Sequence, residues 1–305
     1  MKHLVFGSVA LLALTAAGPV AAADMPVRAP VYKAPQAMVA AHNWTGFYVG
    51  GNVGYGWGDR TVTFTPNDVV LQNVTCGGTF GGTCAPPTSF DVNGALGGLQ
   101  AGYNWQFNQN WLLGIETDFD WSRIQGTGTS NFFLGNIVPA ASNFQATQNV
   151  KWFGTVRGRL GFLPTNNMLL YGTAGFAYGR VDENLVVNSQ AGAGATNTVF
   201  AYNCVAGPNC FLGRSSRTPT GWTAGAGFEY APWSNVSFKG EYLYVNLGGG
   251  DAVNVVVQDA LTFIPSSFTA AFSRTDFHVV RAGLNFHFGG YGKGPVGKGP
   301  VVAGY

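Results

Sequence analysis

Apolar and polar residues alternate with a period of two through most of the chain between residues 44 and 288. In the segment 44–57, Phe47, Val49, Val53 and Tyr55 fall on one face with Trp57, while glycine and asparagine occupy most of the other. A helix would scatter these residues around its circumference, whereas a strand places alternate side chains on opposite faces. The pattern therefore predicts a β-strand with one apolar face.

Seven further segments follow the same pattern, at residues 95–107, 111–123, 150–162, 168–181, 220–230, 236–245 and 275–288. The segment 168–181 is apolar on both faces, so its phase stays open. The connections alternate in length. They are short at 108–110, 164–167 and 231–235, and long at 58–90, 124–147, 183–217 and 246–274. Short turns at one rim and long loops at the other are typical of a transmembrane β-barrel.

The fold class that this pattern predicts is all-β. We expect an eight-stranded antiparallel transmembrane β-barrel over residues 44–288, with short periplasmic turns and four long extracellular loops. Trp and Tyr residues near strand ends would form aromatic girdles at the bilayer surfaces: Trp44, Trp57, Trp105, Trp111, Trp121, Tyr230 and Tyr244. A soluble β-sandwich or a lipocalin-like barrel is the alternative, but either would expose its polar face.

Composition supports a barrel in a membrane. Charged residues make up 10% of the chain, against ~25% in typical soluble domains. Aromatic residues make up 14%, and 45 of the 305 residues are glycine. The net charge of +2 gives no reason to expect a nucleic-acid partner.

Both ends of the chain fall outside the strand pattern. Residues 1–22 read as an export signal, with Lys2 followed by an apolar run at 4–16 that is too short to span a membrane as a helix. A helical anchor is the weaker alternative. We expect a Pro-rich periplasmic arm at 23–43 and a Gly/Pro-rich periplasmic tail at 289–305.

Charged residues on the inner face are expected to form one network. An eight-stranded barrel has an interior only wide enough for side chains, and ionised groups there are costly unless paired. Five acids and five bases are expected inside: Glu116, Asp118, Asp120, Glu229 and Glu241, with Lys151, Arg157, Arg159, Lys239 and Arg281. Aligning the strands predicts Glu116 near Arg159, Asp118 near Arg157 and Glu241 near Arg281. The balance favours a structural plug over an ion pathway.

Four cysteines lie in the expected long loops, Cys76 and Cys84 in the first and Cys204 and Cys210 in the third. An even number of cysteines in an exported chain favours disulfides over free thiols. Closing a short loop is cheap, so we expect bonds within each pair, with bonds between the loops as the alternative.

No catalytic or cofactor site is expected. Glu116, Asp118 and Asp120 could do acid–base chemistry in principle, but they share one strand face with arginines expected opposite. The histidines lack metal-ligand spacing, and the glycine-rich GGTFGG at 77–82 is not followed by a helix, as a phosphate-binding loop would be.

The segment NWTGFYVGGNVGYGWG (43–58), after an export signal and ADMPVRAPVYKAP, resembles the alphaproteobacterial small outer-membrane β-barrel proteins. These are porin-family surface proteins with an OmpA-type barrel, several of them surface antigens. The resemblance implies the outer membrane of a Gram-negative cell, with outer-membrane lipid and lipopolysaccharide around the barrel. In outer-membrane barrels the last strand resembles a signal for the barrel assembly machinery, whose pattern Arg281, Gly283, Phe286 and Phe288 match. The tail after Phe288 departs from the usual terminal position of this signal.

Some proteins of this family are attached to peptidoglycan through a mature Ala-Asp terminus. Ala23 and Asp24 lie at the expected cleavage point, so the resemblance implies the same attachment, with a plain linker as the alternative. The expected function is structural: a barrel that supports the envelope and presents surface loops. A narrow porin-like channel for small solutes is the alternative, and an outer-membrane enzyme is the weakest reading.

Overall fold

The structure is a computed structural model that describes residues 43–69, 72, 85–133, 141–189, 211–257 and 267–288. Every described residue belongs to one compact unit. Ala23, Asp24, the four cysteines and the expected tail lie outside the described residues. Within the described ranges, no helix is long and apolar enough to cross a membrane.

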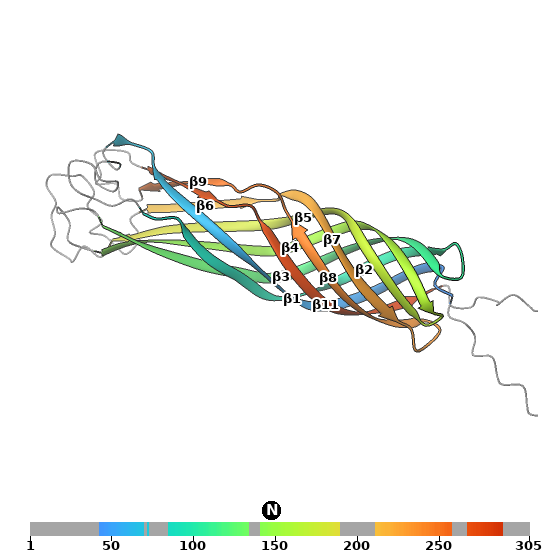
Figure 1. Cartoon of the computed structure of the whole chain (residues 1–305). Helices are drawn as coiled ribbons and strands as arrows, with labels where there is room; N and C mark the ends of the chain where they lie inside the picture. The colour runs from blue at the N-terminus through green and yellow to red at the C-terminus, as the bar shows by residue number, and fades with distance from the viewer. Residues whose placement is uncertain are drawn as a thin grey trace, which may run out of the picture. The chain divides into compact units, whose positions relative to one another are not determined.

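The described residues form one antiparallel sheet of eleven strands that closes on itself (Figure 1). The strands are β1 (Gly46–Pro66), β2 (Thr88–Gln106), β3 (Trp111–Phe133), β4 (Ala141–Thr165), β5 (Met168–Ser189), β6 (Phe211–Arg217), β7 (Thr220–Tyr230), β8 (Val236–Asn246), β9 (Ala252–Val257), β10 (Ser267–Phe272) and β11 (Asp276–His287). The first five run nearly the full length of the barrel, whereas the other six are shorter and lie end to end in pairs.

Two rings of eight strands are stacked along the barrel. The turn-side ring, named for the short turns at its end, runs β1-β2-β3-β4-β5-β7-β8-β11 and closes because β11 pairs with β1. The loop-side ring uses the far ends of β1 to β5 together with β6, β9 and β10, and β10 joins it to β1. The ladder between β2 and β3 ends at the pair Asn93–Gln125, so these two strands are not paired farther into this ring. The predicted ring of eight antiparallel strands is confirmed.

The turn-side ring carries apolar side chains outward, as the alternation predicted. Its exposed large apolar residues include Phe47, Val53, Leu99, Trp105, Ile115, Trp121, Leu160, Phe176, Trp222, Phe228, Leu284 and Phe286. Polar and charged side chains of the same strands point inward and are buried. This arrangement is the reverse of a water-soluble protein and requires an apolar surrounding.

The loop-side ring has the opposite polarity. On β1, Val62 and Phe64 point inward and are buried, whereas Thr61, Thr63 and Thr65 point outward. The same alternation continues on β4, where Phe144 and Ala146 are buried between exposed or partly exposed polar residues. The inner side chains of this ring form one apolar cluster. Beyond the turn-side ring, the barrel is therefore built like a soluble one.

The extent of the expected long loops is wrong. The intervals 58–90, 124–147, 183–217 and 246–274 contain much of β1, β3, β4, β5, β6, β9 and β10. These intervals are rich in Thr, Ser, Asn and Gly because their outward face is polar. This composition is also typical of loops, although the period-two alternation persists in it.

Three strand interruptions lie between the two rings, at residues 218–219, 247–251 and 273–275. We call them the seam. Backbone hydrogen bonds cross it, from Gly179 N to Pro219 O at 3.2 Å and from Leu247 N to Thr275 O at 2.8 Å. Gly248 adopts φ 87°, which favours glycine because it lacks a Cβ. The seam separates the strands on one side of the barrel, while β1 to β5 pass through.

Candidate functional site

The turn-side end of the barrel is filled by an apolar cap. Trp44 is 1% exposed and packs with Leu112, Leu163, Leu169, Tyr171 and Ala231. Its indole Nε1–H donates to the backbone oxygen of Asn166 at 3.0 Å, and its ring meets that of His287 edge-on at 5.6 Å. The expectation that Trp44 belongs to an outer girdle is therefore wrong, because this residue precedes β1 and folds across the barrel mouth.

Arg157 lies at the centre of the interior charge network. Its guanidinium donates to Glu116 at 2.5 Å, to Asp118 at 2.7 Å and to Glu241 at 3.0 Å. The remaining Nε–H donates to Thr155 Oγ1 at 2.9 Å. Arg157 is fully buried, so these acceptors replace the water that the cation has lost.

Arg281 shares two carboxylates with Arg157 and adds a third to the network. It donates to Asp120 at 2.7 Å and to Asp118 and Glu241 at 2.8 Å each. Arg281 comes from β11, whereas the two aspartates come from β3, so the contacts span the barrel interior. Lys239 of β8 adds a contact to Glu116 at 2.6 Å.

Arg159 connects the network to the apolar cap. It donates to Glu229 at 2.6 Å and to Glu116 at 3.3 Å, and its guanidinium lies 4.1 Å from the centre of the Tyr171 ring. The Tyr48 hydroxyl accepts from Arg159 at 2.8 Å and donates to Glu116 at 2.6 Å. Aromatic rings and charged groups thus pack against one another between the strands.

The structure brings together nine of the ten charged residues expected inside, and they are all buried. The register pairs Glu116 with Arg157 rather than with Arg159, although Arg159 also reaches Glu116. The expected proximities of Asp118 to Arg157 and of Glu241 to Arg281 are found.

Lys151 is the exception, and its expected interior position is wrong. Its side chain is exposed on the outer wall. The register between β4 and β5 shifts between Val150 and Trp152, so Lys151 is an extra, bulged residue. A bulge reverses the alternation beyond it, and Val150 accordingly points inward instead of outward. The interior therefore holds five acids and four bases of this set.

Close packing of the network explains several inner glycines. A Cβ at Gly114 would lie 2.8 Å from Arg159 Cγ, and one at Gly54 would lie 2.7 Å from Arg281 Cβ. Both distances are shorter than carbon atoms tolerate. Glycine at these positions leaves room for the long basic side chains.

An apolar plug fills the loop-side ring. Phe153 and Phe277 meet edge-on at 5.3 Å just beyond the charge network, and both are fully buried. Farther along, Phe144 stacks on Phe64 at 4.1 Å and meets Phe268 edge-on at 5.0 Å. Among the described residues the apolar cluster comprises 25 buried side chains, and it reaches from the loop-side ring into the turn-side ring, where Leu243 lies on β8 and Val279 on β11.

A smaller polar cluster lies at the seam. Buried Arg60 donates to Gln148 at 2.5 Å, and Gln148 donates to Glu183 at 2.8 Å. Arg217 reaches Glu183 at 3.4 Å, Thr275 at 3.1 Å and the backbone oxygen of Gly249 at 3.1 Å. Burial raises the pKa of Glu183 above its ordinary value, although the contacts with Gln148 and Arg217 oppose the shift. Arg217 thus ties the end of β6 to the other two interruptions.

The charged groups of the interior serve to fill and stabilise the barrel. Each carboxylate of the network has an oxygen 2.5–2.7 Å from a basic nitrogen, so these groups are engaged by their neighbours. Among the described residues, no group of three or more His, Cys, Asp or Glu side chains could hold a metal ion.

The residues expected to form the assembly signal lie on or directly after β11. Arg281 points inward, whereas Phe286 and Phe288 are exposed on the outer wall with their rings 5.3 Å apart. A Cβ at Gly283 would lie 2.9 Å from the backbone oxygen of Gly51 on β1. The backbone N–H of Phe288 donates to Phe47 O at 2.9 Å, so the pairing with β1 extends to this residue. Their role as a recognition signal stays a prediction.

Sequence reasoning missed the tyrosines that complete the network. Tyr48 and Tyr171 are buried beside Arg159. Tyr48 has the inward phase of β1, which was the available signal, but a tyrosine among glycines carried no charge to pair. Tyr171 lies in the segment whose phase was left open.

Comparison with known proteins consistently gives matches to outer-membrane proteins. The model of the family described as "Outer membrane protein beta-barrel domain" matches residues 9–288. The "31 kDa outer-membrane immunogenic protein" of Brucella melitensis is 36% identical over 293 residues, which cover 94% of this chain and 100% of that protein. The "22 kDa outer membrane protein" of Rhizobium leguminosarum bv. viciae is 27% identical, over 69% of this chain and 68% of that protein.

Solved structures give weaker matches. Ail, the attachment invasion locus protein of Yersinia pestis, is 14% identical with a TM-score of 0.29, covering 79% of this chain and 99% of its own. The outer membrane protease OmpT from Escherichia coli is 10% identical with a TM-score of 0.39, covering 82% of this chain and 99% of its own. At these TM-scores they add nothing to the strand pairing described above.

Proposed function

Because this chain belongs to the family of outer membrane protein β-barrel domains, we propose that it is a structural barrel, closed to solutes, that supports the envelope. In this proposal the turn-side ring spans the outer membrane. The loop-side ring projects from the cell and presents the loops, and both chain termini are periplasmic. The relatives' names describe outer-membrane immunogenic proteins, which suits a surface-exposed loop side. No catalytic activity is proposed.

The observation that carries the proposal is the double filling of the barrel. The charge network occupies the turn-side ring, and the apolar plug occupies the loop-side ring beyond it. A conducting path would have to separate ion pairs and then pass through packed phenylalanines. Barrels with aqueous channels have ~16–18 strands, and this ring has eight.

Conductance in planar bilayers tests the closed state. Refolded protein is expected to give no stable openings, while a 16-stranded porin in the same bilayers serves as the positive control. Stable openings of porin size would contradict the proposal and favour a solute channel. Surface proteolysis of intact cells tests the orientation separately, since cleavage is expected only on the loop side.

Attachment to peptidoglycan is a further part of the proposal. Ala23 and Asp24 lie at the expected end of the export signal, and a free Ala23 amine could be acylated by a cell-wall peptide. Mass spectrometry of N-terminal peptides from purified sacculi is expected to show this adduct. A mature terminus at Asp24 that never carries a muropeptide would leave the barrel untethered.

We also propose that the assembly machinery reads β11 through Phe286 and Phe288, which are exposed together on the outer wall. Replacing both with Ala is expected to reduce the amount of folded barrel in cells. Phe176→Ala is the matched control, because Phe176 is also an outward aromatic but lies on β5. Equal amounts of folded barrel in all three proteins would contradict a role in recognition.

A further inference from the structure

Three cations gather on the outer wall where the two rings meet. Arg123, Lys151 and Arg180 are all exposed, and they come from the adjacent strands β3, β4 and β5. Between the pairs Trp121–Trp152 and Ile124–Val150, the only residues are Ser122 and Arg123 on β3 and Lys151 on β4. Arg180 is the Cα partner of Trp152 on the next strand. Neighbouring strands lie ~4.8 Å apart, so the backbones of β3 and β5 are about 10 Å apart here.

The bulges create this cluster. Both Lys151 and Trp152 lie toward the outer face because the register shifts between Val150 and Trp152. Without the extra residue, Lys151 would face the interior. Among the described residues, Arg123 and Lys151 form no ion pair, while Arg180 contacts Asp182 at 3.3 Å. The cluster thus carries three positive charges against one nearby negative charge.

Aromatic side chains lie directly on the turn-side of the cations. Trp152 stacks on Phe119 with ring centres 5.3 Å apart, and its ring meets that of Tyr178 edge-on at 6.1 Å. Trp121 is exposed beside them. Tryptophan and tyrosine collect at the level of lipid headgroups, so the cations lie at the depth where headgroup phosphates would be.

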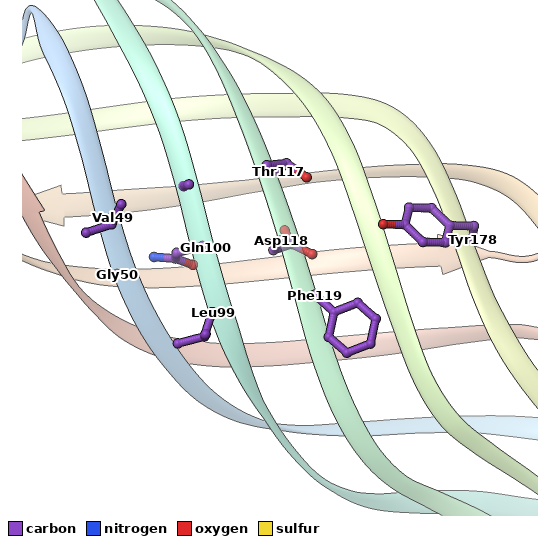
Figure 2. Close-up of a pocket in the computed structure, with 9 residues that line it drawn as sticks. Val49, Gly50, Leu99, Gln100, Thr117, Asp118, Phe119 and Tyr178 are labelled. Atoms are coloured by element: carbon purple, nitrogen blue, oxygen red, sulfur yellow. The ribbon is translucent and has the colours of Figure 1, made fainter.

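A groove continues from these aromatics along the apolar wall (Figure 2). Its volume is about 630 Å³, and its lining includes Val49, Leu99, Ala101, Thr117, Phe119 and Tyr178. Small side chains at Ala101 and Thr117 form the hollow between larger neighbours. The Thr117 hydroxyl donates to Thr155 O at 3.0 Å, so its polar group is satisfied within the wall. The groove suits an acyl chain.

The groove and the cations are joined by two strands. Tyr178 borders the groove, and Arg180 follows it two residues later on the same face. Phe119 borders the groove on β3, and Arg123 lies four residues farther, about 14 Å along the strand. A lipid with its headgroup on the cations could therefore lay an acyl chain in the groove.

We propose that Arg123, Lys151, Arg180 and the groove form a binding site for a phosphorylated glycolipid of the outer leaflet. Three cations on three adjacent strands fit a broad headgroup with more than one phosphate better than a headgroup with one. The assignment of the lipid to the outer leaflet depends on the proposed orientation of the barrel. In this one point the inference rests on the proposed function. Conductance and surface proteolysis test the proposed function independently of lipid binding.

Titration of purified full-length protein in detergent, read by native mass spectrometry, tests the headgroup contacts. The probes are diphosphorylated lipid A, monophosphorylated lipid A with the same acyl chains, and phosphatidylglycerol. We expect the triple variant Arg123→Gln/Lys151→Gln/Arg180→Gln to bind diphosphorylated lipid A at least about tenfold more weakly than the wild type. Each surface cation adds a modest attraction to the headgroup. Arg214→Gln/Arg274→Gln removes two exposed cations elsewhere and is expected to change binding less than about twofold.

The groove is tested by filling it. Ala101→Phe is expected to weaken the binding of both forms of lipid A by the same factor. Ala174→Phe, which lies on the outer wall away from the groove, is expected to leave the binding unchanged. Heat-dependent gel migration shows that each variant is folded. The proposal is overturned if the triple variant binds like the wild type, if phosphatidylglycerol binds as tightly as diphosphorylated lipid A, or if Ala101→Phe has no effect.

Discussion

At the scale of single residues, Arg157 and Lys151 show that the position of a charged side chain decides how much it contributes to stability. Both lie on β4 and were expected inside. Arg157 is buried among Glu116, Asp118 and Glu241, whereas Lys151 stands on the outer wall. Removing a buried cation leaves its carboxylates unpaired in a poorly hydrated space, and removing an exposed one leaves nothing behind.

We therefore predict that Arg157→Met lowers the free energy of unfolding by about 3–5 kcal/mol, and Arg157→Glu by more. Lys151→Met, the matched control on the same strand, is expected to change it by less than about 0.5 kcal/mol. The urea midpoint of the refolded protein, followed by tryptophan fluorescence, measures both. Equal midpoints for the two Met variants would show that Arg157 does not hold the network together.

Glu183 gives the seam a dependence on pH. Its pKa in the folded protein is raised by burial, so folding disfavours the charged form and costs stability above that pKa. As pH falls from neutral toward the ordinary glutamate value of about 4.3, the folded protein takes up the proton first and becomes more stable. Below that value both states are protonated and the effect ends.

Glu183→Gln is expected to be more stable than the wild type at pH 7.5, with the difference shrinking toward pH 4.5. Gln can still accept from Gln148 and Arg217, which contact Oε1 of Glu183. Urea midpoints at the two pH values measure this. The nearby groups Arg217 and Asp251 are the same in both proteins, so a constant difference would argue against titration of Glu183.

At the scale of elements, the long strands are the main departure from what the sequence pattern predicted. The apolar outward face identified the strands of the turn-side ring, because 46–57 and 111–121 alternate strongly. In the loop-side ring the apolar residues turn inward and the outward face is Thr, Ser and Asn, which also typify loops. The alternation of Val62 and Phe64 with threonines was the sequence signal for a strand in this ring. The bulge at Lys151 could not be seen, because nothing in a local pattern marks one extra residue.

Hydrogen exchange checks the strand extension. Backbone N–H groups at 125–131 of β3 and 143–149 of β4 pair with each other in the ladder, so we expect their exchange to be slow. The short turn at 107–110 is an internal reference for rapid exchange. If the N–H groups of 125–131 exchange as fast as those of the turn, this interval is a loop and not a strand.

At the scale of the whole molecule, two barrels of opposite polarity share five strands. The turn-side ring depends on an apolar surrounding, while the loop-side ring has its own apolar core and needs only water outside. Their stabilities should therefore respond to different substitutions. Phe144 is deep in the loop-side core and 2% exposed.

We predict that Phe144→Ala destabilises the loop-side ring by about 3–5 kcal/mol and makes it sensitive to protease, while the turn-side ring stays folded. Limited proteolysis followed by mass spectrometry locates the cuts, and heat-dependent gel migration reports the turn-side ring. Phe176→Ala, which removes an outward side chain of similar size, is the control. Loss of both rings together in Phe144→Ala would show that they fold as one unit.

The seam has a mechanical consequence. On one side, β1 to β5 pass from ring to ring as continuous strands, whereas on the other side the wall is held by a few backbone hydrogen bonds and by Arg217. Bending stiffness is thus unequal around the circumference. A sideways load on the loop-side ring would bend the barrel about its continuous strands and change the width of the seam, while the turn-side ring keeps its shape. In the proposed orientation, flow past the cell would therefore tilt the loop-side ring along one fixed direction.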